Sequence, residues 1–413
     1  MFGGGGGAFG GGGGGAFGGG GGAFGGGGGF GQAQTSGGFG AQPAAAGFGA
    51  QPAAGFGAAA ATGGFGAAAK DPNPNQDKLC SPAPQDSVSS MKWSPASGGK
   101  THLSATCWDG TIVVYAVDAQ GGTTVPVSNT HPSQVPCLGA DWHTDGSKIF
   151  SCYGDNTAHM FDLTTQALTQ IGQHQAPVST IAWSGPLNSA LTGSWDKTLK
   201  FWTPGNPTAV GTINLPERCY TMDLIDEYVV VGCADRKVAI YDVRQCSQGN
   251  TQPLKSEVSP LKFQTRTVAM FPEKDGYAIG SIEGKVGIQY FQETGTKKHF
   301  SFRCHRSEGN GKQDVYAVNC IAFNKQYQTF ATVGADGVYN FWDKTNKQRL
   351  KQFKPLPEPI TAAAFSHDST IFAYASCYDW HKGIDGLNPA SPKQVYLHSC
   401  TPQELQKRPK NRR

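Results

Sequence analysis

Short apolar segments alternate with polar turns along most of this chain. From about Asp86 onward one order recurs: an apolar strand, a loop, a second strand that ends in small residues, an acidic turn, and an aromatic-rich third strand. Residues 198–202 (Thr-Leu-Lys-Phe-Trp) and 238–241 (Val-Ala-Ile-Tyr) are typical, because they are β-branched or aromatic and lie between turn residues. The pattern predicts an all-β protein built from one repeated unit.

The repeated unit occurs seven times, and each copy carries an acidic residue at the same turn. These anchors are Asp109, Asp155, Asp196, Asp235, Glu283, Asp336 and Asp379. Their successive spacings are 46, 41, 39, 48, 53 and 43 residues. Four short strands in a period of roughly 40 to 45 residues are typical of WD40 repeats. One such sheet cannot bury both faces alone, so the sequence predicts a seven-bladed WD40 β-propeller.

The third unit carries side chains that suit the buried hydrogen-bond tetrad of WD40 repeats. His174, Asp196 and Trp202 have the expected types, and Ser194, or alternatively Thr192, supplies the hydroxyl. We expect a structural role, in which the carboxylate fixes the turn and the imidazole tautomer. The other units keep the acid but mostly lack the opening His or the closing Trp.

The first 70 residues have a different composition from the rest of the 413. They hold 32 of the 58 Gly, nine Phe that are each followed by Gly, and one charged residue, Lys70. Isolated aromatics among Gly, Ala and Gln cannot bury enough surface to offset chain entropy, so we predict a disordered tail. The Phe-Gly dipeptides resemble nuclear-pore repeats. This resemblance implies weak contacts with other Phe-Gly segments or transport receptors; a passive spacer is the alternative.

Several classes of protein are disfavoured by what the sequence lacks. No apolar run approaches the roughly 18 residues of a transmembrane helix, and no secretory leader is evident, so we expect an intracellular protein without membrane insertion. Eleven Cys without a C-x-x-C pair favour buried reduced thiols over zinc or disulfides. No catalytic motif is present, so we expect neither an enzyme nor a bound metal or cofactor.

Positive charge is concentrated in three stretches of a chain whose net charge is only +4. Residues 285–312 carry six Lys/Arg and two Glu, residues 344–354 carry five Lys/Arg and no acid, and residues 407–413 carry five Lys/Arg. A cationic surface on two neighbouring blades suits RNA or an acidic peptide, whereas a solvated face is the alternative reading. The last stretch suits nuclear import, RNA binding or a frayed end.

Longer runs make the resemblance specific. Residues 192–202 (TGSWDKTLKFW), 280–284 (GSIEG) and 302–306 (FRCHR) resemble those of the messenger-RNA export factor family of WD40 propellers, and the likeness extends from about residue 72 to the C-terminus. The resemblance implies a propeller at the nuclear pore and nuclear envelope that shuttles to the cytoplasm. It further implies that one face binds the acidic GLEBS hairpin of a nucleoporin and that the propeller contacts single-stranded RNA.

The family's binding positions carry over onto seven residues of this chain, and Arg303 and Arg306 complete the expected set. Lys285 and Lys347 stand where relatives commonly have Arg, which replaces a bidentate contact by a point charge. The nine expected partner- and RNA-binding residues are Lys285, Phe302, Arg303, Arg306, Trp342, Asp343, Lys344, Lys347 and Arg349.

The sequence therefore predicts a non-enzymatic adaptor for mRNA export. A spindle-checkpoint propeller that reads similar hairpins at kinetochores and a purely architectural pore subunit are the alternatives. The expected organisation is a disordered tail at 1–70, a linker at 71–85, the propeller at 86–400 and a basic tail at 401–413. The segment near Asp77 to Ser81 is a candidate for the outer strand that closes the ring.

Overall fold

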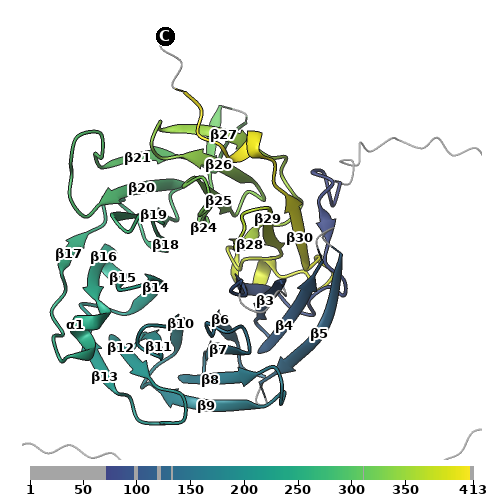
Figure 1. Ribbon diagram of the computed structural model, residues 1–413. Coiled ribbons are helices and arrows are strands. Elements are labelled where there is room, and N and C mark those ends of the chain that lie inside the picture. Colours follow the sequence, from purple (N-terminus) through teal and green to yellow (C-terminus); the bar gives the residue numbers. More distant parts are fainter. Residues whose placement is uncertain (1–70, 97–100, 119–121, 132–133, 310, 410–413) are drawn as a thin grey trace, which may run out of the picture. The chain divides into compact units, whose positions relative to one another are not determined.

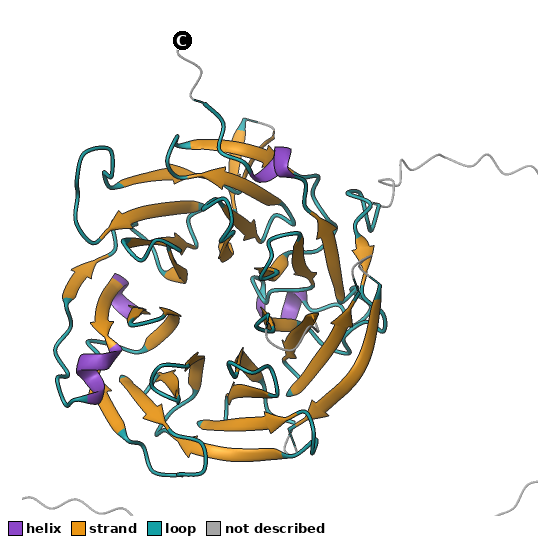
Figure 2. Ribbon diagram, viewed as in Figure 1, coloured by secondary structure: helices purple, strands orange, loops and turns teal. Residues whose placement is uncertain are grey.

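The computed structural model describes residues 71–96, 101–118, 122–131, 134–309 and 311–409. The tail predicted at residues 1–70 lies outside the described residues. Strands dominate the described part, in which seven four-stranded antiparallel sheets surround a common axis (Figures 1 and 2). The predicted seven-bladed propeller is confirmed.

Each blade is formed by strands that follow one another in the sequence, except the last. Blade 1 comprises β2 (Val88–Trp93), β3 (Thr101–Cys107), β4 (Thr111–Val117) and β5 (Thr123–Thr130); blade 2 comprises β6 (Cys137–Trp142), β7 (Lys148–Tyr153), β8 (Thr157–Asp162) and β9 (Leu168–Gln173). Blade 3 comprises β10 (Val178–Ser184), β11 (Ser189–Ser194), β12 (Thr198–Trp202) and β13 (Gly211–Asn214); blade 4 comprises β14 (Cys219–Ile225), β15 (Tyr228–Cys233), β16 (Lys237–Asp242) and β17 (Lys255–Val258); blade 5 comprises β18 (Thr265–Met270), β19 (Gly276–Ser281), β20 (Lys285–Tyr290) and β21 (Phe300–Arg303). Blade 6 comprises β24 (Val318–Phe323), β25 (Phe330–Gly334), β26 (Tyr339–Asp343) and β27 (Gln348–Gln352); blade 7 comprises β28 (Ile360–Phe365), β29 (Ile371–Ser376), β30 (Gln394–Ser399) and β1 (Lys78–Leu79).

The acidic anchors lie at the turn between the second and third strands of their blades. The carboxylate accepts a hydrogen bond from the backbone N–H two residues further on, at 2.9 Å for Asp109, 3.1 Å for Asp155, 2.9 Å for Asp196 and 3.1 Å for Asp336. A short acidic side chain is favoured at such a turn because its carboxylate accepts from a backbone N–H that has no partner strand at that point. This local chemistry explains the recurrence of the acid.

The hydrophobic core lies between neighbouring blades. Seven clusters of buried residues are present among the described residues, one at each junction between adjacent sheets. At the junction of blades 5 and 6, for example, Val286 and Ile288 pack with Val318, Phe330 and Trp342. Each sheet thus buries both faces, which is the condition that the repeat pattern imposes.

The last blade joins the two ends of the described chain. β1 pairs with β30 in antiparallel register, Lys78 opposite Leu397 and Leu79 opposite Tyr396, so residues before the first full blade supply the outermost strand. The candidate strand near Asp77 is therefore real, and it lies within the stretch that we expected to be a linker. Downstream, helix α2 (Pro402–Leu405) packs against the ring, so the tail predicted from residue 401 begins as docked structure.

A hydrogen-bond tetrad holds blade 3 together. His174 Nδ1 is 2.9 Å from Asp196 Oδ2, and His174 Nε2 is 2.7 Å from Thr192 Oγ1, which also accepts from Trp202 Nε1 at 2.7 Å. Burial lowers the pKa of His174 although Asp196 acts to raise it, so the ring is neutral at physiological pH. The linking hydroxyl is Thr192, not Ser194; Ser194 instead donates to the Ala176 carbonyl at 2.9 Å.

Three smaller features complete the described part. Helix α1 (Val243–Ser247) follows β16, 3-10 turns occur at Ala234–Arg236 and Gly383–Gly386, and a separate hairpin of β22 (Arg306–Gly309) and β23 (Lys312–Val315) stands between blades 5 and 6.

All eleven Cys are free and nine are buried, in agreement with the reduced thiols expected. No described helix has the length and apolar character needed to span a bilayer.

Candidate nucleic-acid and partner interface

A groove of about 350 Å³ opens between the outer part of blade 5 and the outer part of blade 6. Strand β21 forms one wall, and strand β26 with its following turn forms the other. We call it the blade 5–6 groove. It is lined by Phe300, Ser301, Phe302, Arg303, Phe330, Trp342, Asp343, Lys344, Lys347 and Gln348. Six of the nine residues expected at the interface thus surround one concavity.

Aromatic rings form the floor of the blade 5–6 groove. The ring centroids of Phe302 and Trp342 are 4.6 Å apart, and Phe302 is 6.3 Å from Phe330 behind it. Phe302 is half-buried, whereas only 9% of the Trp342 surface is exposed. The floor therefore presents a partly exposed aromatic surface on which a base or an apolar side chain can pack.

Exposed cations stand over these rings. Lys347 Nζ is 4.5 Å from the centroid of Phe300, and Arg349 Cζ is 5.8 Å from that of Trp342. Arg303 is exposed on β21 across the groove. Such cation–π contacts hold the charged groups beside the aromatic floor without neutralising them. The groove can therefore offer a ligand stacking and positive charge together.

Asp343 and Lys344 also line the groove, but their polar groups are already engaged. Asp343 Oδ1 accepts from the backbone N–H groups of Thr345 at 2.8 Å and Asn346 at 3.2 Å, which fixes the turn after β26. The Lys344 ammonium is 2.7 Å from Glu273 Oε1, and the side chain is only 4% exposed. Both residues shape the groove, and Lys344 is not the free cation that we expected.

Trp342 also makes a structural hydrogen bond within its own blade. Its Nε1 donates to Thr332 Oγ1 at 2.9 Å, and Thr332 Oγ1 also lies 2.9 Å from His305 Nε2. His305 Nδ1 is in turn 2.9 Å from Asp336 Oδ1, so blade 6 repeats the tetrad of blade 3. The same indole therefore holds its blade together with one edge and lines the groove with another.

The spacing within the two tetrads shows why the second was overlooked. The acid precedes the Trp by six residues in both blades, but His305 lies 31 residues before Asp336, against 22 between His174 and Asp196. The hairpin β22–β23 occupies the additional residues. A search that allowed an insertion after the His would have found the tetrad.

Lys285 is the first residue of β20 and lies opposite Arg303 of β21 in the register of the two strands. Its ammonium is 2.6 Å from Glu283 Oε2, and Glu283 Oε1 accepts from the Lys262 backbone at 2.9 Å. Burial acts to raise the pKa of Glu283, but the hydrogen bonds with Lys285 and the Lys262 backbone hold it below its usual value. A carboxylate from a partner would therefore compete with a carboxylate that is already present.

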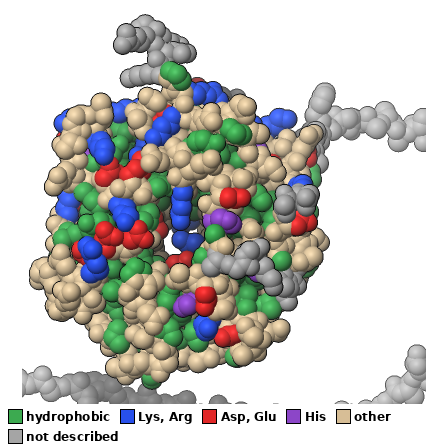
Figure 3. Space-filling model, viewed as in Figure 1, with side chains coloured by type: hydrophobic (Ala, Val, Ile, Leu, Met, Phe, Trp, Pro, Cys, Tyr) green, Lys and Arg blue, Asp and Glu red, His purple; other side chains and the backbone are tan. Residues whose placement is uncertain are grey.

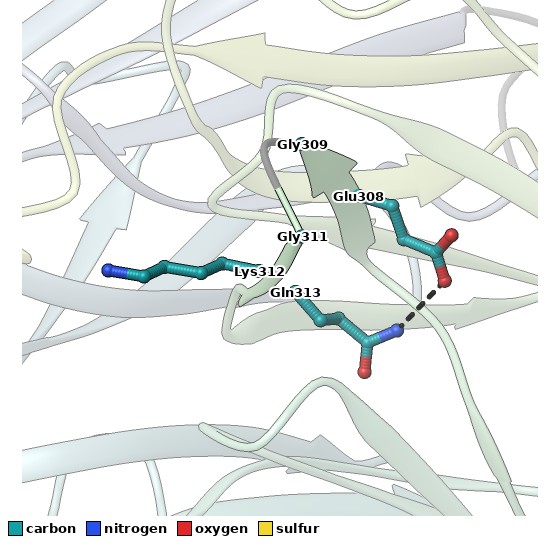
Figure 4. Close-up of a pocket in the computed structure, with 5 residues that line it drawn as sticks. All are labelled: Glu308, Gly309, Gly311, Lys312 and Gln313. Carbon is teal, nitrogen blue, oxygen red and sulfur yellow. Dashed lines mark hydrogen bonds between the residues drawn. The ribbon is translucent and has the colours of Figure 1, made fainter.

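Arg306 ties the hairpin β22–β23 to the same turn. Its Nη2 donates to the Glu283 carbonyl at 2.9 Å, and its Nη1 donates to Gln313 Oε1 at 2.8 Å. Figure 4 shows Gln313 and Glu308 pointing toward one another near the tip of the hairpin, with Lys312 projecting on the opposite side. Arg306 is thus a structural brace and does not reach the blade 5–6 groove.

Ion pairs with Asp and Glu neutralise part of the positive charge expected on blades 5 and 6. Among the cations of residues 285–312, Lys285, Lys297 and Lys298 each lie within 4 Å of a carboxylate. Figure 3 shows Lys and Arg interspersed with Asp and Glu on the face it presents, without one continuous positive patch. Among the described cations without a carboxylate within 4 Å, Arg303 and Lys347 line the groove and Arg349 lies over Trp342, whereas Lys312 and Lys354 are exposed and do not line the groove.

The described residues contain no cluster of three or more His, Cys, Asp or Glu side chains arranged to hold a metal ion. The fold, the recurrent acidic turns and the two tetrads define a WD40-repeat β-propeller. The family model for the WD domain, G-beta repeat, matches residues 122–162, 165–203 and 299–343.

Comparison with known proteins narrows the class. The chain is 42% identical over 333 residues to Protein Rae1 of Drosophila melanogaster, which covers 79% of this chain and 94% of that protein. It is 39% identical over 333 residues to the Poly(A)+ RNA export protein of Schizosaccharomyces pombe, covering 80% and 92%. It is 40% identical over 348 residues to the mRNA export factor of Xenopus tropicalis, covering 82% and 93%. The chain belongs to this family of mRNA export factors.

Proposed function

We propose that this protein is a non-catalytic adaptor in mRNA export that binds single-stranded RNA in the blade 5–6 groove. The names of its relatives support a role in export and hence in nucleocytoplasmic transport. The observation that carries the RNA assignment is the aromatic floor of Phe302 and Trp342 beneath the exposed cations Arg303, Lys347 and Arg349. Stacking surfaces next to positive charge are what a single strand requires.

The experiment is to measure binding of a fluorescent oligouridine at two salt concentrations. The double variant Lys347→Gln, Arg349→Gln should weaken binding about tenfold and lower the salt slope by about 1.4, which is about 0.7 for each phosphate that is no longer neutralised. Lys200→Gln is the matched control, because Lys200 stands 5.7 Å from the tetrad Trp202 of blade 3, away from the groove. Equal affinities for the groove variant and the control would exclude RNA binding at this site.

A second part of the proposal concerns the face that carries Lys285, where an acidic hairpin of the GLEBS type would bind. Ile282 and Phe263 are exposed there by 40% and 55%, and the Ile282 backbone N–H donates to the carbonyl of Gln264, which follows Phe263. Apolar side chains beside Lys285 suit a hairpin that has both acidic and apolar residues. At this site a carboxylate of the partner would bind the Lys285 ammonium in place of Glu283.

Binding of a synthetic acidic GLEBS peptide tests this second part. Lys285→Glu should weaken peptide binding at least tenfold by like-charge repulsion, while Lys285→Met should have a smaller effect because it removes the attractive charge without adding a second negative one. If neither substitution changes the peptide affinity, the hairpin binds elsewhere. In a pull-down with the intact protein, recovery of kinetochore proteins in place of pore proteins would favour the checkpoint role.

A further inference from the structure

The chain after β30 returns to blade 6 and is anchored there. Helix α2 packs against β26 and β27 (Figure 1). Leu405, the last residue of α2, is 2% exposed in the core between blades 6 and 7, and its carbonyl accepts from the buried hydroxyl of Thr329 at 2.9 Å. Glu404 pairs with Lys351 of β27. We call residues 402–408 the strap.

The far end of the strap is bonded to the turn that forms one wall of the blade 5–6 groove. The carbonyl of Arg408 accepts from Asn346 Nδ2 at 3.0 Å and from Gln348 Nε2 at 2.9 Å. These two side chains come directly before and after Lys347, and both Lys347 and Gln348 line the groove. Asn346 Nδ2 also donates to Asp343 Oδ2 at 2.8 Å. The strap therefore holds this wall from outside the groove.

Lys347 has a backbone conformation that residues with a Cβ rarely adopt. Its φ is +55°, in the left-handed region where the Cβ crowds the backbone. Its ammonium nevertheless lies 4.5 Å from the ring centroid of Phe300, on the β21 wall of the groove. Because a lysine side chain has many rotamers, its surroundings must supply the order that keeps this ammonium in one place.

The equivalent turn of blade 2 shows what the strap adds. There Asp162 Oδ1 accepts from the backbone N–H groups of Thr164 at 2.8 Å and Thr165 at 3.1 Å. Gln166 follows with φ +57°, so this turn matches the turn after β26. The carbonyl of Gln166 accepts from Asn129 Nδ2 at 3.4 Å, and no described residue of the strap takes part. The shape of the turn is thus a property of its own sequence, whereas the strap fixes the side chains beside the left-handed residue.

We propose that the strap positions Lys347 for RNA binding by holding Asn346 and Gln348 on either side of it. The inference rests on the proposed RNA-binding function. Binding costs less conformational entropy when a side chain is already held where the ligand needs it, because fewer rotamers are lost. The strap is therefore a positioning element, and Lys347 is the residue that contacts the phosphate.

The basic side chains of the described strap bond elsewhere. Lys407 Nζ donates to Gln328 Oε1 at 3.1 Å, and Arg408 Nη2 donates to the carbonyl of Gln403 at 3.0 Å. Neither Lys407 nor Arg408 lines the blade 5–6 groove. What the described strap supplies at the groove is therefore a carbonyl acceptor, and its effect on a ligand passes through the turn.

The test is a set of double-mutant cycles on the full chain, with oligouridine as the ligand. Leu405→Ser removes the apolar anchor of the strap, and Thr329→Val is a milder variant that removes only the hydrogen bond to the Leu405 carbonyl. Both leave every charge in place. Each is measured alone, with Lys347→Gln, and with Arg303→Gln as the matched control, because Arg303 is a cation on the β21 wall. Circular dichroism and the melting temperature report whether each variant is folded.

Release of the strap should weaken oligouridine binding about three- to tenfold in the intact protein and about equally in the Arg303→Gln background. With Lys347→Gln the same release should change the affinity by less than about twofold, since the side chain that the strap positions is already gone. If Leu405→Ser does not fold, the cycle with Thr329→Val decides.

Two results would overturn the inference. Equal losses of affinity in all three backgrounds would mean that the strap acts through stability or through other cations of the chain. A lower melting temperature with unchanged affinity would mean that the strap only stabilises the fold.

The same measurements distinguish the inference from the proposed function. If Lys347→Gln weakens RNA binding and release of the strap does not, the groove binds RNA and only the inference fails. If release weakens binding and Lys347→Gln has no effect, the strap acts by another route and the inference is refuted. Intact protein that binds no oligouridine refutes the proposed function itself.

Discussion

The side chains of Asp77, His398 and Glu404, which we call the clasp, make a specific prediction about pH, because the His398 imidazole is buried between the two carboxyl groups. Burial opposes the charged ring, but the hydrogen bonds with Asp77 and Glu404 outweigh burial and raise the pKa of His398 from 6.5 to about 9. The Glu404 carboxyl is likewise buried, and its bonds with His398 and Lys351 lower its pKa to about 2. The directions of these two pKa shifts favour a charged His398–Glu404 pair at physiological pH.

The sign follows from the direction of each shift. A raised His pKa stabilises the fold fully below about pH 6.5, and this contribution is lost as the pH rises through about 9. At about 1.36 kcal/mol for each pKa unit, the rise is worth up to about 3 kcal/mol. The lowered Glu404 pKa contributes stability above about pH 4.5 that is lost as the pH falls toward 2.

The test is chemical unfolding of the intact protein and of His398→Gln between about pH 6 and pH 10. The variant should be less stable by up to about 3 kcal/mol at the lower pH, and the two proteins should converge at the higher pH. The quantity to compare is the difference in unfolding free energy between the two proteins. Buried Cys thiols, whose pKa is raised, also make folding less favourable as the pH rises, but they do so in both proteins. A difference that stays constant over this range would refute a charged clasp.

Three further predictions each compare two substitutions. Thr332→Val should destabilise the protein by about 2–4 kcal/mol in urea unfolding, because a buried imidazole and indole lose their shared hydroxyl, whereas Thr332→Ser should restore most of the loss. Lys344→Met should cost about 2 kcal/mol by leaving Glu273 unpaired, whereas Lys347→Met should leave the melting temperature unchanged and weaken only oligouridine binding. Gly284→Ala should lower stability by more than about 2 kcal/mol, since φ is +59° and the new Cβ would lie 2.7 Å from a carbonyl oxygen, and Gly205→Ala, at φ +85° with open space, measures the strain alone.

The overall fold could be predicted from the sequence because its determinants are local and repeated. The acidic anchors recur at turns where the carboxylate bonds two residues ahead, so each copy carries its own signal. The choice between Thr192 and Ser194 could not be made in this way. Both hydroxyls are near the turn, and only the register of β11 against β12 shows which one faces His174.

The binding side chains were harder to predict, because their partners come from distant parts of the chain. Lys344 looks like a free cation in the sequence, yet Glu273, 71 residues earlier, neutralises it in the fold. The docking of Leu405 was missed for a similar reason. A single apolar residue in a polar segment gives no periodic signal, and its pocket is formed by two other blades.

The contacts that the sequence did not predict change which basic residues can contribute to a binding surface. A basic stretch in the sequence contributes to a binding surface only where the fold leaves its cations without acidic partners. Around the blade 5–6 groove this condition selects Arg303, Lys347 and Arg349 beside the aromatic floor. Because Glu404 belongs to the clasp and directly precedes the buried Leu405, loss of the ion pair should loosen ring closure and the docking of α2 together. The two effects share one cause, so both should be measured on the same clasp variants.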